Sequence, residues 1–466
     1  MLINGDGRWG AKLNVIPMIK KTYVISALFL IASSQVSSTS AQVLKWEIFW
    51  GTSGFDVAAD IAVDNRGSIY ITGVTRGGPF GNDAFVASFD SSGALKEQWF
   101  WGTSGFDEAD GVAVDADGNI YIAGYTNPGP LGGNDAFVAS FDSSGVLRWE
   151  SFWGTSNSDR AYGIAVDSED NVYIAGTTGE DTLGWDAFVA SFDRSGALRW
   201  QTLWNARPFD HAYDVAVDID GNVYITGGTA QTASGPFDAF TVAYDRYGVF
   251  RWQAIWPGSA ICDWANGVAV DVHGNVYIVG LRSWGPFGED DMFIVSYDST
   301  GVFRWETYWG TSSFDAAKNV ALDTSGNIYI AGYTSVSPSP QTNVNASVAS
   351  FDSSGVLKWQ VLWNAQSIDV ANGVAVDVNG NVYIAGYTAP SLDGEYRAFL
   401  VGVSQESVPP EPPPPSIPEF PLGPEIIMIL APMIATAYIW WRGKSKRLVG
   451  VSDSVSKIDR AFILRD

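Results

Sequence analysis

The sequence predicts an all-β protein, a seven-bladed β-propeller with four antiparallel strands in each blade. Two markers lead to this prediction, and each returns seven times at a spacing of about 52 residues. The first is Trp-Gly-Thr-Ser or a relative of it, with its tryptophan at Trp50, Trp101, Trp153, Trp204, Trp256, Trp309 and Trp363. The second is the tyrosine of runs like Val-Tyr-Ile-Ala-Gly, at Tyr70, Tyr121, Tyr173, Tyr224, Tyr277, Tyr329 and Tyr383. Self-similarity at such a period is typical of stacked supersecondary units.

Each repeat unit contains four short apolar runs that are rich in Val, Ile, Tyr, Phe and Trp. Such runs have the composition of strands and are too short for helices. An Asp-x-x-Gly turn separates the first two runs, except at 167–170, where Asp170 replaces the glycine. A turn like Asp-Ser-Ser-Gly separates the last two runs. Asp accepts hydrogen bonds from nearby backbone and Gly takes the positive φ of tight hairpins, so each unit reads as a four-stranded antiparallel blade.

The two ends of the repeat region predict how the ring closes. The seventh unit has a third run at 398–403 but no fourth run after it. The missing run stands at the front, at 43–50, before the first complete unit. We therefore expect this N-terminal strand to complete the last blade. Cys262 is the only cysteine, so no disulfide within the chain supports the ring.

Thirteen of the 20 tryptophans occupy two fixed positions in the fourth run. They are the Trp-Gly series and a second series formed by Trp46, Trp149, Trp200, Trp252, Trp305 and Trp359. A fixed register in every unit predicts packing between blades rather than a ligand platform.

The repeat resembles the bacterial and archaeal β-propeller repeat called SBBP. The likeness lies in strings such as "VAVDADGNIYIAGYT" and "DAFVASFDSSG", and it extends over residues 43–404. The resemblance implies a secreted or surface propeller and supplies no catalytic residues. The sixth unit departs from the pattern, since it reads "TNVNASVAS" where the other units read "DAFVAS" or a close relative.

The N-terminal segment, residues 1–41, predicts an extension and a secretory signal peptide. Lys20 and Lys21 precede the apolar run "TYVISALFLIA", and small residues follow at Thr39 and Ala41. Met18 is an alternative start to Met1.

The C-terminal segment predicts an anchor. A Pro-rich linker at 405–422 leads to an apolar stretch at 423–441, long enough for one transmembrane helix. Arg442, Lys444, Lys446 and Arg447 follow at once, so we expect the propeller outside and the tail, 442–466, in the cytoplasm. The "PEFP" string, apolar helix and basic cluster also resemble the archaeal PEF-type sorting signal. The helix is therefore either a lasting anchor or a signal that is cleaved and replaced by a lipid.

The formal net charge of −24 makes nucleic acid a poor partner for this protein. A third repeated series is also acidic and stands just before the innermost strand of each blade: Asp56, Asp107, Asp159, Asp210, Asp263, Asp315 and Asp369. These carboxylates are candidate ligands for Ca²⁺, which takes six to eight oxygens. The alternative, favoured by their regular repetition, is that each Asp accepts backbone N–H bonds from its own loop.

One face of the predicted ring carries loops that differ from blade to blade, and variable loops on a copied scaffold are where binding usually resides. Trp185 and Trp284 lie in these loops, outside the repeat frame. The residue after the repeated Asp varies too, and blades two to five place four such residues in succession around the mouth. The predicted binding residues are Glu108, Arg160, His211, Trp264, Trp185 and Trp284. As an alternative, they are ordinary rim residues.

These observations predict a membrane-anchored extracellular propeller that serves as a binding, adhesion or structural display module at the cell surface. Its ligand is a surface glycan or a protein. The alternative is an extracellular hydrolase or lyase that acts on polysaccharide with carboxylates in the propeller mouth. A deep pocket with a shielded, non-repeated carboxylate pair would favour the enzyme, and a shallow loop-lined face would favour recognition. With only two histidines, His211 and His273, the sequence offers no catalytic set and predicts no cofactor other than Ca²⁺.

Overall fold

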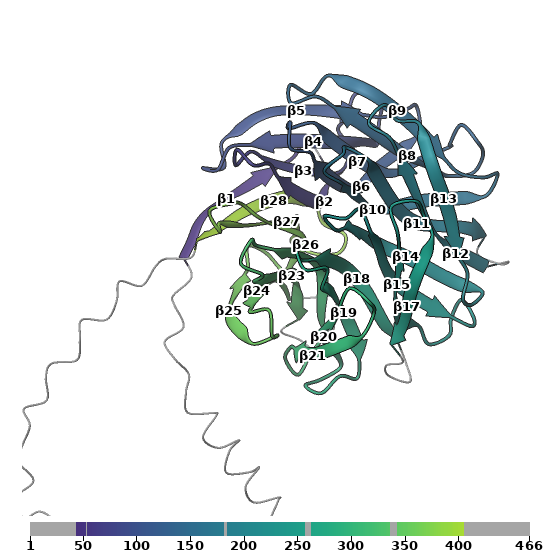
Figure 1. Ribbon diagram of the computed structural model, residues 1–466. Coiled ribbons are helices and arrows are strands. Elements are labelled where there is room, and N and C mark those ends of the chain that lie inside the picture. The colour runs from purple at the N-terminus through teal and green to yellow at the C-terminus, as the bar shows by residue number, and fades with distance from the viewer. Residues whose placement is uncertain (1–42, 53, 181–183, 257–261, 336–342, 405–466) are drawn as a thin grey trace, which may run out of the picture. The chain divides into compact units, whose positions relative to one another are not determined.

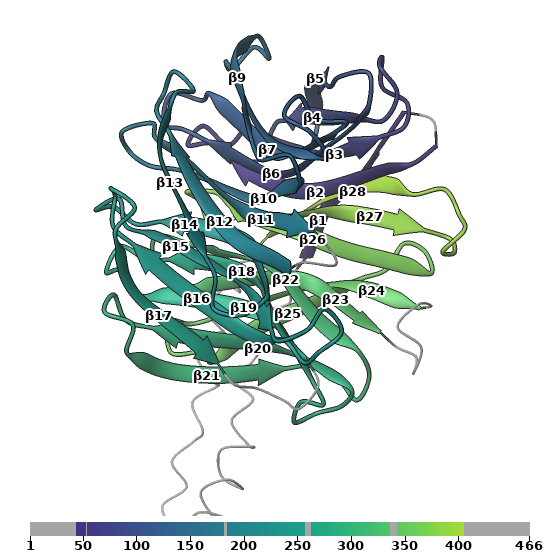
Figure 2. The same ribbon diagram turned by 90° about the vertical axis from the view of Figure 1, so that its right-hand side faces the viewer.

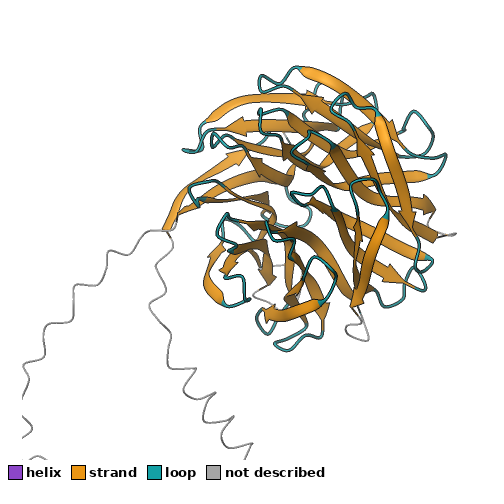
Figure 3. Ribbon diagram, viewed as in Figure 1, coloured by secondary structure: helices purple, strands orange, loops and turns teal. Residues whose placement is uncertain are grey.

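The computed structural model describes residues 43–52, 54–180, 184–256, 262–335 and 343–404. Within these ranges it contains 28 β-strands and no helix. Figure 3 shows these strands joined by loops and turns. The predicted signal peptide (1–41), Pro-rich linker (405–422), transmembrane helix (423–441) and tail (442–466) lie outside the described residues. The described ranges hold no helix that is long and apolar enough to cross a membrane.

The strands form a propeller-like arrangement of four-stranded antiparallel groups, one for each repeat unit (Figure 1). The first unit contains β2 (Asp56–Val63), β3 (Ile69–Thr75), β4 (Asp83–Phe89) and β5 (Leu95–Trp101). The second contains β6 (Phe106–Val114), β7 (Ile120–Asn127), β8 (Asp135–Phe141) and β9 (Leu147–Trp153). The third contains β10 (Ser158–Val166), β11 (Val172–Glu180), β12 (Gly184–Phe192) and β13 (Leu198–Trp204).

The later units repeat this order. The fourth contains β14 (Phe209–Val217), β15 (Val223–Ala230), β16 (Asp238–Tyr244) and β17 (Phe250–Trp256). The fifth contains β18 (Asp263–Val270), β19 (Val276–Ser283), β20 (Asp290–Tyr297) and β21 (Phe303–Trp309). The sixth contains β22 (Asp315–Leu322), β23 (Ile328–Ser335), β24 (Val344–Phe351) and β25 (Leu357–Trp363). The last contains β26 (Ile368–Val376), β27 (Val382–Ala389), β28 (Arg397–Ser404) and, from the other end of the chain, β1 (Val43–Trp50).

The pairing of β1 with β28 confirms that the N-terminal strand completes the last unit. The two strands run antiparallel from the pair Val43 and Ser404 to the pair Trp50 and Ala398. In Figures 1 and 2 the purple start of the propeller lies beside its yellow-green end. Glu47 of β1 also accepts a hydrogen bond from the indole of Trp363 in the preceding unit, at 2.9 Å.

The two repeated aromatic markers have separate structural roles. Each marker tyrosine is buried, and its hydroxyl donates to the Asp of its own Asp-x-x-Gly turn; Tyr121, for example, bonds Asp115 at 2.9 Å. Each Trp-Gly tryptophan packs against the next unit. Trp101 stacks on Phe137 with ring centroids 3.8 Å apart, and its Nε1 donates to Glu150 at 2.9 Å. The predicted packing between units is therefore confirmed.

The two departures from the repeat have physical explanations. In the sixth unit Ser347 stands where other units have the stacking phenylalanine. Trp309 accordingly lies edge-on to Phe351, with centroids 6.3 Å apart. In the turn without glycine, Asp170 itself adopts the left-handed φ of 61°.

The alternating strand directions place the connections on two faces. The turns between the first and second and between the third and fourth strands share one face, which we call the turn face. Arg246 of one such turn donates to the carbonyl of Asp220 in the other. The loops between the second and third strands and the connections between units share the opposite face, which we call the loop face. Asp107, after a connection between units, bonds the carbonyl of Asn82 at the end of such a loop.

Candidate binding site

The innermost strands of all the units, β2, β6, β10, β14, β18, β22 and β26, line a central cavity of about 260 Å³. Each of these strands carries a bulge directly after the repeated Asp-x-Ala, where the register with the second strand shifts by one residue. A bulge re-aims a side chain and interrupts the alternation of the strand. The residues in the bulges all line the cavity: Ala59, Asp110, Tyr162, Tyr213, Asn266, Lys318 and Asn372.

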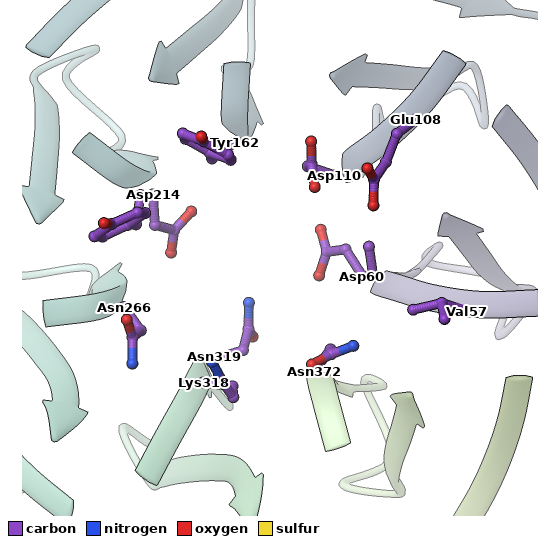
Figure 4. A pocket seen from close by; sticks show the side chains of 13 residues that line it. Val57, Asp60, Glu108, Asp110, Tyr162, Asp214, Asn266, Lys318, Asn319 and Asn372 are labelled. Atoms are coloured by element: carbon purple, nitrogen blue, oxygen red, sulfur yellow. The ribbon is translucent and has the colours of Figure 1, made fainter. Parts of the chain in front are cut away.

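Two carboxylates enter this cavity at a position where four of the seven units have glycine (Figure 4). Asp60 accepts a hydrogen bond from the backbone N–H of Val112 at 3.0 Å, and Asp214 accepts one from Val268 at 2.8 Å. Each bond crosses to the next unit. Burial in the channel raises the pKa of both Asp60 and Asp214 to about 7, although these backbone bonds oppose the shift. Both groups therefore titrate near neutral pH.

Asp110 and Glu108 bring two further carboxylates to the side of the cavity where Asp60 lies, across from Asp214 (Figure 4). Burial raises the pKa of Asp110 well above its usual range, and the charge of Glu108 raises it further. The charge of Arg160 lowers the pKa of both Glu108 and Asp110. Within the described part of the chain, Oδ2 of Asp110 has no hydrogen-bond partner.

Lys318 is the one basic residue among the described residues that line the cavity. Its Nζ lies 5.9 Å from the ring centre of Tyr333, and burial lowers the pKa of this amine. The neighbouring Asn319 reaches toward the backbone N–H of Val374 at 3.5 Å. The cavity thus combines carboxyl, amide, amine and phenol groups, a mixture suited to a polar ligand.

Five of the six predicted binding residues come together beside this cavity. Tyr125 joins two of them: its hydroxyl donates to Glu108 at 2.9 Å, and Arg160 lies over its ring at 4.7 Å. His211 joins two others, with ring centroids 5.8 Å from Trp185 and 6.4 Å from Trp264. Arg160 and His211 belong to units that meet where Tyr162 contacts Tyr213, at 5.6 Å. We call Glu108, Tyr125, Arg160, Trp185, His211 and Trp264 the rim cluster.

Trp284 does not join the rim cluster. It is 62% exposed in the loop after β19 and has a φ of 54°. None of the ring contacts between described residues connects it to the cluster. The expectation that Trp185 also lies in a loop is wrong, since β12 begins at Gly184 and extends the pairing through Trp185.

The repeated acidic series holds the connections between units. Six of its members accept backbone N–H bonds from the connection that precedes them, for example Asp107 from Thr103 at 2.7 Å. The others with such bonds are Asp56, Asp159, Asp210, Asp315 and Asp369. The seventh, Asp263, is buried 3.9 Å from Nε of Arg282. Within the described residues, no three or more His, Cys, Asp and Glu side chains gather as a metal site.

The channel residues Asp60, Asp110, Asp214 and Lys318 were not predicted from the sequence, although the repeat pattern contains a signal for them. Four units have glycine four residues after the repeated Asp, whereas Asp60, Asp214 and Asn319 break that pattern. A departure from glycine in an otherwise copied strand indicates a side chain with its own role.

The SBBP beta-propeller repeat family matches this chain in four places, at residues 102–132, 153–183, 305–338 and 364–389. The chain is also 32% identical over 124 residues to an uncharacterized WD repeat-containing protein of Acanthamoeba polyphaga mimivirus, across 22% of this chain and 9% of that protein. It is 23% identical over 350 residues to the regulatory protein FlaEY of Caulobacter vibrioides, across 60% of this chain and 36% of that protein. It thus spans well under two thirds of either relative's length.

Solved structures with a similar fold include the beta-propeller domain of the Trilobed protease from Pyrococcus furiosus. The match covers 74% of this chain and 95% of that one, at 10% identity and a TM-score of 0.43. A gluconolactonase from Xanthomonas campestris matches 77% of this chain and 100% of its own, at 12% identity and a TM-score of 0.38. These likenesses concern the fold and carry no activity over. The chain therefore carries the SBBP beta-propeller repeat at these four places, within a fold whose described strands form four-stranded groups.

Proposed function

We propose that this protein is a seven-bladed propeller that acts as a binding, adhesion or display module at the cell surface, anchored by a C-terminal transmembrane helix. The observation that carries the binding role is the rim cluster. It brings together side chains from four consecutive units on the loop face, beside the central cavity. Aromatic and arginine side chains of this kind supply most of the energy in protein recognition sites.

The chemistry of the cavity and rim favours a polyhydroxylated ligand such as a surface glycan. Carboxylates and amides at Asp60, Asp214 and Asn266 offer acceptors and donors to hydroxyl groups, while aromatic rings at Trp185 and Trp264 offer apolar faces. The four channel carboxyls offer an anionic ligand no attraction, and each one that ionises repels it.

Val43 and Ser404 pair with each other, so the described chain begins and ends at one place on the turn face, which is the face opposite the rim cluster.

A glycan array probed with the purified full chain tests this function. The variant Trp264→Ala should lose binding by at least about tenfold, as hot-spot truncations do, with its circular dichroism unchanged. The matched variant Ser143→Ala, in a turn of the opposite face, should bind normally. Binding that survives Trp264→Ala and Arg160→Ala but fails with Ser143→Ala would place the ligand on the turn face and refute the proposal.

A second candidate function, a hydrolase or lyase that acts on polysaccharide, has one specific observation in its favour. Asp60 and Asp214 are shielded, non-repeated carboxylates with pKa values of about 7, the range of an effective general acid or base. Release of reducing ends or unsaturated products from polysaccharides, abolished in Asp60→Asn or Asp214→Asn, would establish this activity. Glycan binding without turnover would establish the binding module alone.

A further inference from the structure

In three repeat units the glycine that follows the repeated tryptophan lies between two buried aspartates. The glycines are Gly102, Gly154 and Gly310. One aspartate of each pair stands at the start of the third strand, and the other stands at the start of the next unit's first strand. The pairs are Asp83 with Asp107, Asp135 with Asp159, and Asp291 with Asp315, and all six side chains are at most 1% exposed.

At each glycine, oxygens of both carboxylates approach the point where a Cβ would stand, so the two carboxylates face each other across a narrow gap. The point where a Cβ on Gly102 would stand is 3.0 Å from Oδ1 of Asp83 and 3.0 Å from Oδ2 of Asp107. The corresponding distances at Gly154 are 2.8 Å to Asp135 and 2.7 Å to Asp159. At Gly310 they are 2.8 Å to Asp291 and 2.9 Å to Asp315. The same arrangement therefore occurs three times.

At each gap, one carboxylate oxygen of the third-strand aspartate lacks a hydrogen-bond donor. Oδ2 of Asp83 accepts the backbone N–H of Phe80 at 2.8 Å, and Oδ2 of Asp291 accepts that of Phe287 at 2.6 Å. Asp135 is held in the same way by Leu131. In contrast, Oδ1 of Asp83, Asp135 and Asp291 has no hydrogen-bond partner among the described residues. A buried carboxylate oxygen without a partner is costly, and here it faces a second carboxylate.

Burial raises the pKa of Asp83, Asp135 and Asp291, and the opposing carboxylate raises each of them further. Two negative charges at such a pair are therefore unfavourable unless a proton or a cation joins them.

In other units of the same chain, polar side chains occupy the equivalent position. In the third and sixth units asparagine replaces the glycine. Nδ2 of Asn205 donates to Asp186 at 2.5 Å, and Nδ2 of Asn364 donates to Asn345 at 2.5 Å. In the last unit Arg397 stands where the third-strand aspartate stands elsewhere. These units place a donor or a cation at the third-strand position. In the three glycine units a threonine donates to Oδ2 of the other aspartate, as Thr103 does to Asp107, but no described residue donates to Oδ1 of the third-strand aspartate.

We propose that the protein binds three divalent cations of the Ca²⁺ type, each in the gap between two aspartates. The three pairs are Asp83 with Asp107, Asp135 with Asp159, and Asp291 with Asp315. Ca²⁺ accepts carboxylate, carbonyl and water oxygens in flexible geometry, whereas Mg²⁺ requires a tighter octahedron. With only two carboxylates per site, we expect weak binding of the kind found in extracellular modules, with Kd values of about 10⁻⁴–10⁻³ M. Each cation would join the third strand of one unit to the first strand of the next.

Calcium titration of the full chain, stripped with EDTA and dialysed, tests the proposal. Isothermal calorimetry with CaCl₂ should give a stoichiometry of three, and the melting temperature should rise by several degrees as CaCl₂ reaches about 10 mM, well above the expected Kd. MgCl₂ should produce a smaller rise. Absence of binding with an unchanged melting temperature, or an equal response to MgCl₂, would overturn the proposal.

A triple variant separates cation binding from general stability. Gly102→Asn, Gly154→Asn and Gly310→Asn together copy the solution of the third and sixth units, and none of the three glycines has a positive φ. This variant should lose calcium binding and match or exceed the melting temperature of the calcium-free protein. The matched control Ser104→Asn, Ser156→Asn and Ser312→Asn places the same side chains at exposed positions of the same connections and should bind three ions.

Single variants keep the test decisive if the triple variant fails to fold. Gly102→Asn alone should lower the stoichiometry from three to two. Retention of three bound ions in this variant would overturn the assignment of that site.

Discussion

The outer strands of this propeller repeat nearly the same residues in every unit, whereas the residues of the channel wall differ from unit to unit. Along the outer strands, tryptophan after tryptophan stacks on a phenylalanine of the next unit, as Trp153 does on Phe188 at 3.8 Å and Trp204 on Phe240 at 4.1 Å. Along the channel, the residues in the equivalent bulge range from Ala59 to Tyr162 and Lys318. Packing between units requires side chains of similar shape at each interface, whereas the side chains that line the channel are free of this requirement. The positions that vary are therefore where this chain's particular chemistry resides.

Removal of residues 43–50 should have the largest effect, because it breaks the framework at its closure. The deletion removes every pair between β1 and β28, the bond from Trp363 to Glu47, and the stack of Trp50 on Phe85. It also exposes the edge of β28, and such edges promote aggregation. Size-exclusion chromatography should show oligomers, and the melting temperature should fall. A monomeric variant that melts like the intact chain would contradict the role assigned to β1.

Substitution of a framework tryptophan should be the next largest effect. Trp204 is 7% exposed, and Trp204→Ala should cost about 3–5 kcal/mol of the free energy of unfolding, as for other buried aromatics. Trp284 is 62% exposed, so Trp284→Ala should cost less than about 1 kcal/mol. Equilibrium denaturation in urea measures both. Equal losses would remove the distinction between the copied framework and the residues outside it.

The channel carboxylates should make stability depend on pH. The folded-state pKa of Asp60 and of Asp214 is about 7, above the ordinary value of 3.8, so the folded state binds more protons between these values. Stability should therefore fall as pH rises from about 4 to about 7 and then level off. We expect about 1–2 kcal/mol for each carboxyl rather than the full shift, because the effective dielectric constant at buried sites is higher than that of a dry interior.

The double variant Asp60→Asn and Asp214→Asn isolates this contribution. Its melting temperature should change less between pH 5 and pH 8 than that of the unmodified protein, and it should be more stable at pH 8. A pH profile identical to that of the unmodified protein would show that these two carboxyls are not the source.

The smallest expected effect concerns the rim. Arg160 lies 4.7 Å from the ring centre of Tyr125, and a partly exposed cation–π contact contributes about 0.5–1 kcal/mol. Arg160→Ala should lose about that much stability in urea denaturation. A double-mutant cycle with Tyr125→Leu should recover the same coupling energy, and a coupling near zero would mean that the two residues are neighbours without interaction.

The fold could be predicted from the sequence because the residues that build it repeat in register. The spacing of the tryptophans, the Asp-x-x-Gly turns and the unpaired run at 43–50 led to the strand groups and to the closure through β1, and the structure confirms both. The rim residues Glu108, Arg160, His211 and Trp264 could be singled out because they vary at a fixed position. Their contacts through Tyr125 and Tyr162 depend on the spacing between units, which no sequence position states.

The channel carboxylates escaped prediction for a physical reason. In a regular strand, side chains alternate between the two faces. The first and third residues after the repeated Asp would then lie on one face, and the fourth residue would lie on the opposite face. The bulge inserts an extra residue, so Asp110 at position three and Asp60 at position four both reach the cavity. Bulges depend on local backbone geometry and leave little trace in hydrophobic periodicity.

The strand that completes the last unit also sets an order of events during biosynthesis. β1 is made first, yet its partner β28 is made last, and Trp363 must find Glu47 across 316 residues of chain. Until translation reaches that point, the nascent protein exposes unpaired edges at both ends, a state that favours association with other chains. Contacts between such distant residues also slow folding.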